Sequence, residues 1–240
     1  MIPLIQPGGP IGVPTLVLQS KSGESLGAIN GASEIVYKKN LNSANELSFT
    51  VPKYLDGALN PIWNSLTDLK NIWIPELEER FEIKVSFREE GMETKSITGT
   101  SLCEAELGQI LLRGLEINTD QDLLYNSTDQ YPTTVFYRDI LSTDPPETIA
   151  QKKKHSLLHR VLSDKASFYR IGHVDSALKN RAYTFTANGT NIYDFLTGDV
   201  AEQMQCLFQF DSMERVINVY ALTDENGNEI YGKDTTILVD

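Results

Sequence analysis

The chain has 240 residues, 40% of them hydrophobic, so it is long enough to bury a core in one large domain or two ordinary ones. Its 33 acidic and 21 basic residues give a formal net charge of −12, which argues against a surface built to bind nucleic-acid phosphates. Solubility is the simplest explanation of this charge. An alternative is an acidic passage that repels DNA and lets it slide through.

The opening stretch, MIPLIQPGGPIGVP, is rich in Pro and Gly. It lacks the basic n-region and long apolar h-region of a signal peptide, and no apolar run in the chain approaches membrane-spanning length. We therefore expect a protein made in a cytoplasm, with no export signal and no membrane span. Cys103 and Cys206 lie far apart in apolar segments, which favours buried free thiols over a disulfide or a metal pair.

The first half of the chain is predicted to be a meander of short strands. In NELSFTVP, the residues Leu47, Phe49 and Val51 fall on one face of a strand, which is the period-two pattern of a half-buried strand. Pro52 ends it, because proline lacks the N–H needed to extend a central ladder. Earlier strands are expected at residues 15–19 and in SEIVYKK.

A short helix and a hairpin are predicted next. Asn60 and Pro61 suggest an N-cap with proline at the first helical position, opening a helix that runs to Leu69. Alternation in FEIKVSF then predicts a strand, followed by a turn at Glu90-Gly91 and a returning strand through Ile97.

The second half is predicted to mix helices and strands. Residues 118–146 are rich in Asp, Thr, Ser and Pro and form the best candidate for a boundary or long connection. The stretch ETIAQKKKHSLLHRVLSDKA is compatible with a helix whose cationic middle is solvated. Near-helical spacing predicts the strongest helix at Ile192, Phe195, Leu196, Val200 and Met204. The strands CLFQF and RVINVYAL, an Asn226-Gly227 turn and TTILV would complete a closing β-meander.

Two histidine arrangements are candidate sites. His155 and His159 are four residues apart, as a zinc-binding pair on one helix would be, but Ser156 stands where a zinc protease has its glutamate. A solvated helix face explains the pair better. His173 and Asp175 resemble two members of a catalytic triad, yet no nucleophile accompanies them, and a strand-end histidine bonded into a turn is the ordinary alternative.

Other candidates have simpler explanations. The acidic pairs Glu78-Glu79 and Glu89-Glu90 could serve glycoside hydrolysis, but solvated turns account for them. Residues 224–229, DENGNE, lack the ligand order of a calcium loop and fit a hairpin turn. Trp63 and Trp73 fit core positions. We therefore predict no catalytic residue, no cofactor-binding residue, no metal ligand and no cofactor.

Two blocks of sequence resemble the N-terminal hub region of phage and prophage tail proteins, the tail-associated lysin or prophage endopeptidase tail family. The first block comprises NELSFTVP, NPIWNSL and FEIKVSF. The second comprises LLHRVLSDKASFYRIGHVDSAL and RAYTFTANGTNIYDFLTGDVAEQMQCLFQFDSMERVINVY, with a fixed order of helix, strand, GHVD turn, strand, helix, strand and strand.

The resemblance implies a protein similar to the baseplate hub of contractile-tailed phages, where a homotrimeric ring closes the tail tube and opens for DNA ejection. Its fold would be a β-rich α+β fold in which a tube-like β-barrel domain is followed by a smaller α+β domain. The implied segments are a β-barrel-like hub domain I at residues 1–125, a connection at 126–154 and an α+β hub domain II at 155–240.

The implied partners are the distal tail protein, the tape-measure protein and the tail tube, and DNA would pass through the lumen without specific binding. The implied location is the virion tail tip, assembled in a bacterial cytoplasm. Proteins of this family usually continue into further domains, so any lytic activity would belong to a C-terminal module and this chain is expected not to be an enzyme. The alternatives are a metal- or carboxylate-dependent cell-wall hydrolase and a carbohydrate-binding adhesion module.

Overall fold

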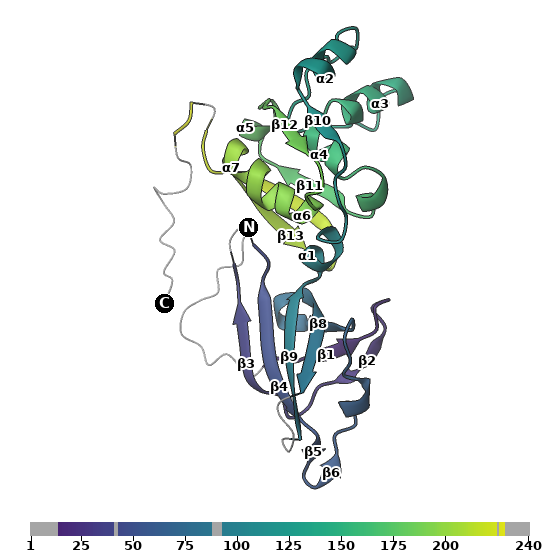
Figure 1. Cartoon of the computed structure of the whole chain (residues 1–240), viewed down its shortest axis with the longest axis vertical. Coiled ribbons are helices and arrows are strands. Elements are labelled where there is room, and N and C mark those ends of the chain that lie inside the picture. The colour runs from purple at the N-terminus through teal and green to yellow at the C-terminus, as the bar shows by residue number, and fades with distance from the viewer. Residues whose placement is uncertain (1–13, 41–42, 88–92, 225, 229–240) are drawn as a thin grey trace. The chain divides into compact units, whose positions relative to one another are not determined.

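Seven strands from the first part of the chain form one antiparallel sheet in the computed structural model, which describes residues 14–40, 43–87, 93–224 and 226–228 (Figure 1). The strand order is β2-β1-β7-β8-β9-β4-β3. The strands are β1 (Val17–Gln19), β2 (Ser25–Ala28), β3 (Ser33–Lys38), β4 (Glu46–Pro52), β7 (Asn71–Ile74), β8 (Glu79–Phe87) and β9 (Thr94–Ser101), and a separate small hairpin pairs β5 (Tyr54–Leu55) with β6 (Ala58–Leu59).

The alternation in β4 places its apolar side chains in the core of this sheet. Leu47, Phe49 and Val51 are almost fully buried, and β4 ends at Pro52 as predicted. The strands β8 and β9 alternate in the same way. They add Phe81, Ile83 and Ile97 to this core. The predicted turn at Glu90-Gly91 lies outside the described residues.

Gly99 on β9 leaves room for the side chains of the two neighbouring strands, β8 and β4. A Cβ atom at this position would lie 2.9 Å from the Cβ atom of Phe81 and 3.4 Å from that of Leu47. Phe81 can therefore occupy its position in the core because residue 99 has no side chain.

The sheet is open, so the expected closed β-barrel is wrong. Closure would require the edge strands β2 and β3 to pair, and within the described residues they do not. Both edges are irregular: Glu34 on β3 has φ 52° beside a shift of register, and Gly27 on β2 has φ 136°. Such irregularities disfavour the pairing of an edge with a further strand.

The helix expected from Asn60 to Leu69 is much shorter than predicted. Asn60 does accept a hydrogen bond from the Ile62 N–H through Oδ1 at 3.2 Å, but only one 3₁₀ turn, Trp63–Ser65, follows. Leu69 has φ 62° and donates its N–H to the Ile83 carbonyl, so the chain has already joined the sheet.

The chain divides into two compact units, one of Met1–Lys38 with Asn45–Leu102 and one of Lys39–Ala44 with Cys103–Asp240. The change of unit thus falls at Leu102, whereas composition suggested a boundary within 118–146 and the family resemblance implied a connection at 126–154. The second unit holds more of the chain than the first, unlike the smaller second domain expected, because 103–154 folds with it.

The second unit contains short helices around a three-stranded sheet and a two-stranded ladder. In the sheet, ordered β11-β14-β13, β11 runs parallel and β13 antiparallel to β14, and β10 pairs with β12. Its elements are α1 (Leu102–Leu107), β10 (Leu115–Ile117), α2 (Asp120–Tyr125), α3 (Pro146–Lys154), α4 (Leu157–Val161), η3 (Asp164–Ala166), β11 (Arg170–Val174), α5 (Ser176–Lys179), β12 (Phe185–Ala187), α6 (Ile192–Phe195), η4 (Leu196–Val200), α7 (Ala201–Met204), β13 (Cys206–Asp211) and β14 (Val216–Ala221).

The strongest predicted helix is confirmed as the continuous run α6–η4–α7. Asn191 caps it by accepting the Asp194 N–H at 2.8 Å, and Gln205 ends it with φ 51°. The predicted apolar positions Ile192, Phe195, Leu196, Val200 and Met204 are all buried. Cys103 and Cys206 lie buried in the same core and form no disulfide, as expected, and burial raises the pKa of Cys206 to about 12.

The whole described chain is therefore a β-rich α+β protein. Within the described residues, no helix combines the length and the apolar character needed to cross a membrane. The predicted strand TTILV lies outside the described residues.

Candidate functional site

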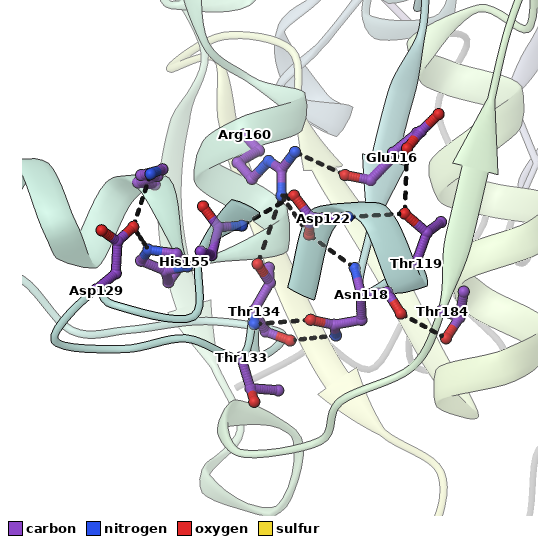
Figure 2. A network of polar contacts seen from close by, with 12 residues as sticks. Glu116, Asn118, Thr119, Asp122, Asp129, Thr133, Thr134, His155, Arg160 and Thr184 are labelled. Atoms are coloured by element: carbon purple, nitrogen blue, oxygen red, sulfur yellow. Dashed lines mark hydrogen bonds and ion pairs between the residues drawn. The ribbon is translucent and has the colours of Figure 1, made fainter. Parts of the chain in front are cut away.

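A network of polar groups in the second unit joins β10, α2, α4, the residues just before β12 and the residues 126–145 between α2 and α3 (Figure 2). One part of it centres on Asp122 and Arg160, and the other on Asp129 and His155. Every element that contributes to it belongs to the same compact unit.

Arg160 on α4 is the hub of the first part. Its Nη2 donates to the Glu116 carbonyl at 2.6 Å, and its Nη1 lies 3.3 Å from Oδ2 of Asp122 and 3.5 Å from Oγ1 of Thr134. A guanidinium group with several donors in a planar fork suits such a junction of three segments. Figure 2 shows these side chains converging from α2, α4 and the intervening connection.

Asn118 forms the second junction. Its amide Oδ1 accepts the Thr134 N–H at 2.9 Å, and its Nδ2 donates to the carbonyls of Thr134 at 2.7 Å and Tyr183 at 3.0 Å. Its backbone has φ 51°, a conformation that Asn tolerates better than most residues. Its N–H donates to Asp122 Oδ2 at 2.9 Å, so Asn118 also fixes the start of α2.

The start of α2 carries a capping arrangement that the sequence analysis missed. Thr119 is the N-cap and accepts the Asp122 N–H at 3.2 Å, and Asp122 reaches back toward the preceding backbone. Thr followed three residues later by an acidic residue is the signal that could have revealed it. The tertiary partners Arg160 and Thr134 carry no such local signal.

In the second part of the network, the Asp129 carboxylate binds two side chains, the ammonium group of Lys154 and the imidazole of His155. Its Oδ2 lies 2.6 Å from Nζ of Lys154 and 2.9 Å from Nε2 of His155. Hydrogen bonds from Lys154 and then His155 lower the pKa of Asp129. The carboxylate is thus held in its charged form and accepts from both neighbours.

His155 is fully buried, which corrects the expectation of a solvated helix face. Burial lowers the pKa of its imidazole, and this outweighs the opposing effect of Asp129. Its carbonyl accepts the Val135 N–H at 3.2 Å and Arg138 Nε at 3.0 Å. Among the described residues, its Nδ1 has no hydrogen-bond partner.

His155 and His159 do not lie on one helix, so the predicted metal-type spacing is not realised. α3 ends at Lys154, and Ser156 is extended with φ −130° and ψ 121° before α4 begins. His159 instead packs against Tyr137, with ring centroids 5.1 Å apart, and burial lowers its pKa. No cluster of three or more potential metal ligands occurs in the part of the chain that the structure describes.

His173 and Asp175 are brought together at the end of β11. His173 Nε2 lies 2.6 Å from Asp175 Oδ1, and the other carboxylate oxygen accepts the Ala221 N–H at 2.8 Å. The ring also lies beside Tyr220, and the His173 N–H donates to Asn218 Oδ1. Within the described residues, no serine, threonine or cysteine side chain bonds to either residue, so the pair ties β11 to β14.

The remaining candidates are dispersed. Glu78 is the left-handed end of a 3₁₀ turn, whereas Glu79 accepts hydrogen bonds from Tyr37 and Asn45. Glu89-Glu90 lie outside the described residues. Asp224 accepts the N–H groups of Asn226 and Asn228 at 2.8 Å each, which is the predicted turn. Trp63 and Trp73 are half-buried, and the Trp63 ring receives Lys95 Nζ at 4.5 Å.

Comparisons with known proteins give little further constraint. No family model matches the chain, and no curated protein matches it. Among solved structures, it is similar to prophage tail protein gp18 from Listeria monocytogenes EGD-e, with a TM-score of 0.48 and 8% identity over 86% of this chain. The match covers 50% of that chain, so this protein spans about half the length of its structural neighbour. A TM-score this low establishes neither a shared fold nor a shared function.

Proposed function

We propose that this protein is a structural component of a phage tail, acting in the hub of the tail tip or baseplate. In this role it closes the tail tube, links it to host-facing elements and opens for DNA ejection. The proposal originates in the two sequence blocks that resemble tail hub proteins.

The proposal is supported most directly by the second block, whose predicted helices and strands occur in the predicted order, although two short helical turns that were not predicted lie among them. α4 is followed by β11, β12, the α6–α7 run, β13 and β14, with η3 inserted before β11 and α5 after it. The predicted turn at GHVD is instead the end of β11 and the N-cap residue of α5. The helix α4, the four strands and the α6–α7 run all contribute buried apolar residues to one core. This agreement supports the resemblance on which the proposal rests.

The polar network is consistent with a scaffold. Its carboxylates accept hydrogen bonds from side chains and backbone groups of the same unit, as Asp122 does from Arg160 and Asn118. Half-buried polar groups that are paired in this way hold segments in one arrangement. The network therefore supports a structural role, in which these polar groups stabilise the fold and do not serve as reactive groups.

The assembly we propose is a homotrimeric ring that contacts the distal tail protein, the tape-measure protein and the tail tube at the virion tail tip. A ring with cyclic symmetry requires a large interface between copies. The formal net charge of −12 suits a lumen through which DNA passes without binding.

We also propose that this chain is not an enzyme and that any lytic activity belongs to another module. Support comes from the two histidine–carboxylate pairs, each of which is engaged in holding backbone segments together. Asp129 is shared with Lys154, and Asp175 with the Ala221 N–H.

The native mass of the purified chain, measured by mass spectrometry or light scattering over a wide range of concentrations, tests the ring. A trimer is the expected result. A chain that stays monomeric at the highest concentrations would contradict ring closure by this chain. A peptidoglycan-release assay on the same sample tests the second proposal, since turnover that scales with protein concentration would contradict it.

A further inference from the structure

α3 is held on the second unit by polar contacts rather than by apolar packing. None of the residues of Pro146–Lys154 is buried. In its last turn, Lys152 Nζ lies 2.7 Å from Oδ2 of Asp144, which precedes the helix, and at its end Lys154 Nζ lies 2.6 Å from Asp129 Oδ2. A helix attached in this way has a low free energy of local opening.

His155 is the buried part of this attachment. It follows α3 directly, its side chain is fully buried, and its ring bonds to Asp129. Its carbonyl accepts from Val135 and Arg138, and Val135 in turn accepts the Leu157 N–H at 2.8 Å. His155 therefore connects the end of α3 to the strand-like bridge between Val135 and Ser156.

The hydrogen bond to Asp129 defines the protonation of the neutral ring. A carboxylate only accepts, so Nε2 carries the hydrogen and Nδ1 carries a lone pair. A second proton would create an N–H at Nδ1, and no acceptor for it exists among the described residues. A buried donor without an acceptor disfavours the protonated form.

We propose that His155 and Asp129 form a proton-sensitive lock, which holds α3 on the second unit near neutral pH and releases it in acid. This inference is independent of the proposed function. The lock is a property of the second unit alone, and it applies whether or not the chain forms a ring.

The charged groups around His155 support the same direction. Lys154 from α3 and Arg138 from the preceding connection both oppose a further positive charge, whereas Asp129 favours it. Burial is the largest effect and lowers the pKa of His155. His159 on α4 is a second buried imidazole with a lowered pKa, so it must be separated from His155 by experiment.

The sign of the pH effect follows from this direction. A histidine whose folded-state pKa lies below its unfolded value binds more protons in the open state. Its stabilising contribution is complete above the ordinary histidine pKa, about 6.5, and is lost as the pH falls below that value. Opening of α3 should therefore increase in mild acid.

Amide hydrogen exchange on the full chain tests the lock at about pH 8 and about pH 5, with rates corrected for the intrinsic effect of pH. The reporters are the α3 amides and the Val135 amide. Their protection factors should fall several-fold at the lower pH, by at most about 30-fold for a single histidine whose unfolded pKa is about 6.5. The amides of β13 and β14 serve as the internal control and should keep their protection.

Three substitutions assign the effect. His155→Gln retains a donor for Asp129 but does not titrate, so the acid response of α3 should disappear. His159→Gln and His173→Gln should leave that response in place. Persistence of the full response in His155→Gln would overturn the proposal.

A second measurement decides the matter if His155→Gln does not fold. The ring of His155 in the unaltered protein is titrated by NMR, alongside the exposed His173. Titration of His155 below the ordinary histidine value together with loss of α3 protection supports the lock. Titration at or above that value, or α3 protection that does not change with pH, overturns it.

Discussion

Glu106 and Arg215 form a two-pronged ion pair across a separation of 109 residues. Arg215 Nη2 lies 2.7 Å from Glu106 Oε1, and Arg215 Nε lies 3.1 Å from Oε2, which also accepts the Tyr169 hydroxyl at 2.9 Å. The pair joins α1 to the turn between β13 and β14, where Arg215 has φ 50°. Paired parallel hydrogen bonds of this kind are stronger and more specific than single ones.

Glu106→Gln should lower the free energy of unfolding by about 1–3 kcal/mol, because Arg215 and Tyr169 lose a shared charged acceptor. Urea denaturation followed by circular dichroism measures this. The exposed pair Arg170–Glu214 provides a matched control, since both side chains are more than two-thirds exposed at 68% and 69%. Glu214→Gln should change stability by less than about 1 kcal/mol. Equal effects of the two substitutions would contradict the importance assigned to Glu106.

Arg181 should be the most sensitive cation of the second unit. Its guanidinium donates to the carbonyls of Ala177, Met204, Thr223 and Asp224 at distances of 2.6 to 3.1 Å. Arg181→Met leaves these acceptors without their donor and should cost about 3 kcal/mol. Arg181→Lys keeps the charge but not the planar fork, so it should retain only part of the stability. If Lys restored full stability in denaturation, charge alone would explain the role of Arg181.

Gly99→Ala should destabilise the first unit. The added Cβ atom would lie 2.9 Å from the Cβ atom of Phe81, which is closer than packed carbon atoms normally approach. A loss of about 1–3 kcal/mol is expected from overpacking and is measured by thermal or urea denaturation. Gly198→Ala is the control, because nothing lies within 4 Å of a Cβ there and the position is helical and exposed. It should be neutral or stabilising.

Two substitutions of Asn118 should separate its hydrogen bonds from its backbone conformation. Asn118→Gly loses the three amide bonds to Thr134 and Tyr183 but accepts φ 51° without strain. Asn118→Ala loses the same bonds and adds a left-handed penalty of about 1–2 kcal/mol. The Ala variant should therefore be less stable than the Gly variant by about that amount. Equal stabilities in urea denaturation would show that the backbone strain is absent.

The spacing of apolar residues predicted the structure correctly where one face of a strand or helix packs against a single core. The alternation of Leu47, Phe49 and Val51 predicted β4 and its buried face, because successive residues of a strand point to opposite sides. The spacing from Ile192 to Met204 predicted the α6–α7 run for the corresponding helical reason. The N-cap Asn191 lies directly before that run, so its start was also visible in the sequence.

The predictions of helix boundaries were wrong where a distant segment of the chain forms hydrogen bonds with the residues of the predicted helix. The expected continuous helix around HSLLH is interrupted because Ser156 forms a bridge to Val135, and no local signal marks that partner. Leu69 likewise leaves its predicted helix to bond the Ile83 carbonyl. The seven-stranded sheet is open because β2 and β3 do not pair within the described residues, and a period-two pattern does not reveal which strands pair.

The sequence by itself determined which residues are buried along β4 and the α6–α7 run, and that both cysteines lie in apolar segments. Only the tertiary structure decided that Asp129, Lys154 and His155 meet, that Arg160 joins Asp122 to Thr134, and that Glu106 reaches Arg215. Patterns report which side of an element avoids water, because that side repeats with the period of the backbone. A polar contact between distant residues has no period, so it exists only once the chain has folded.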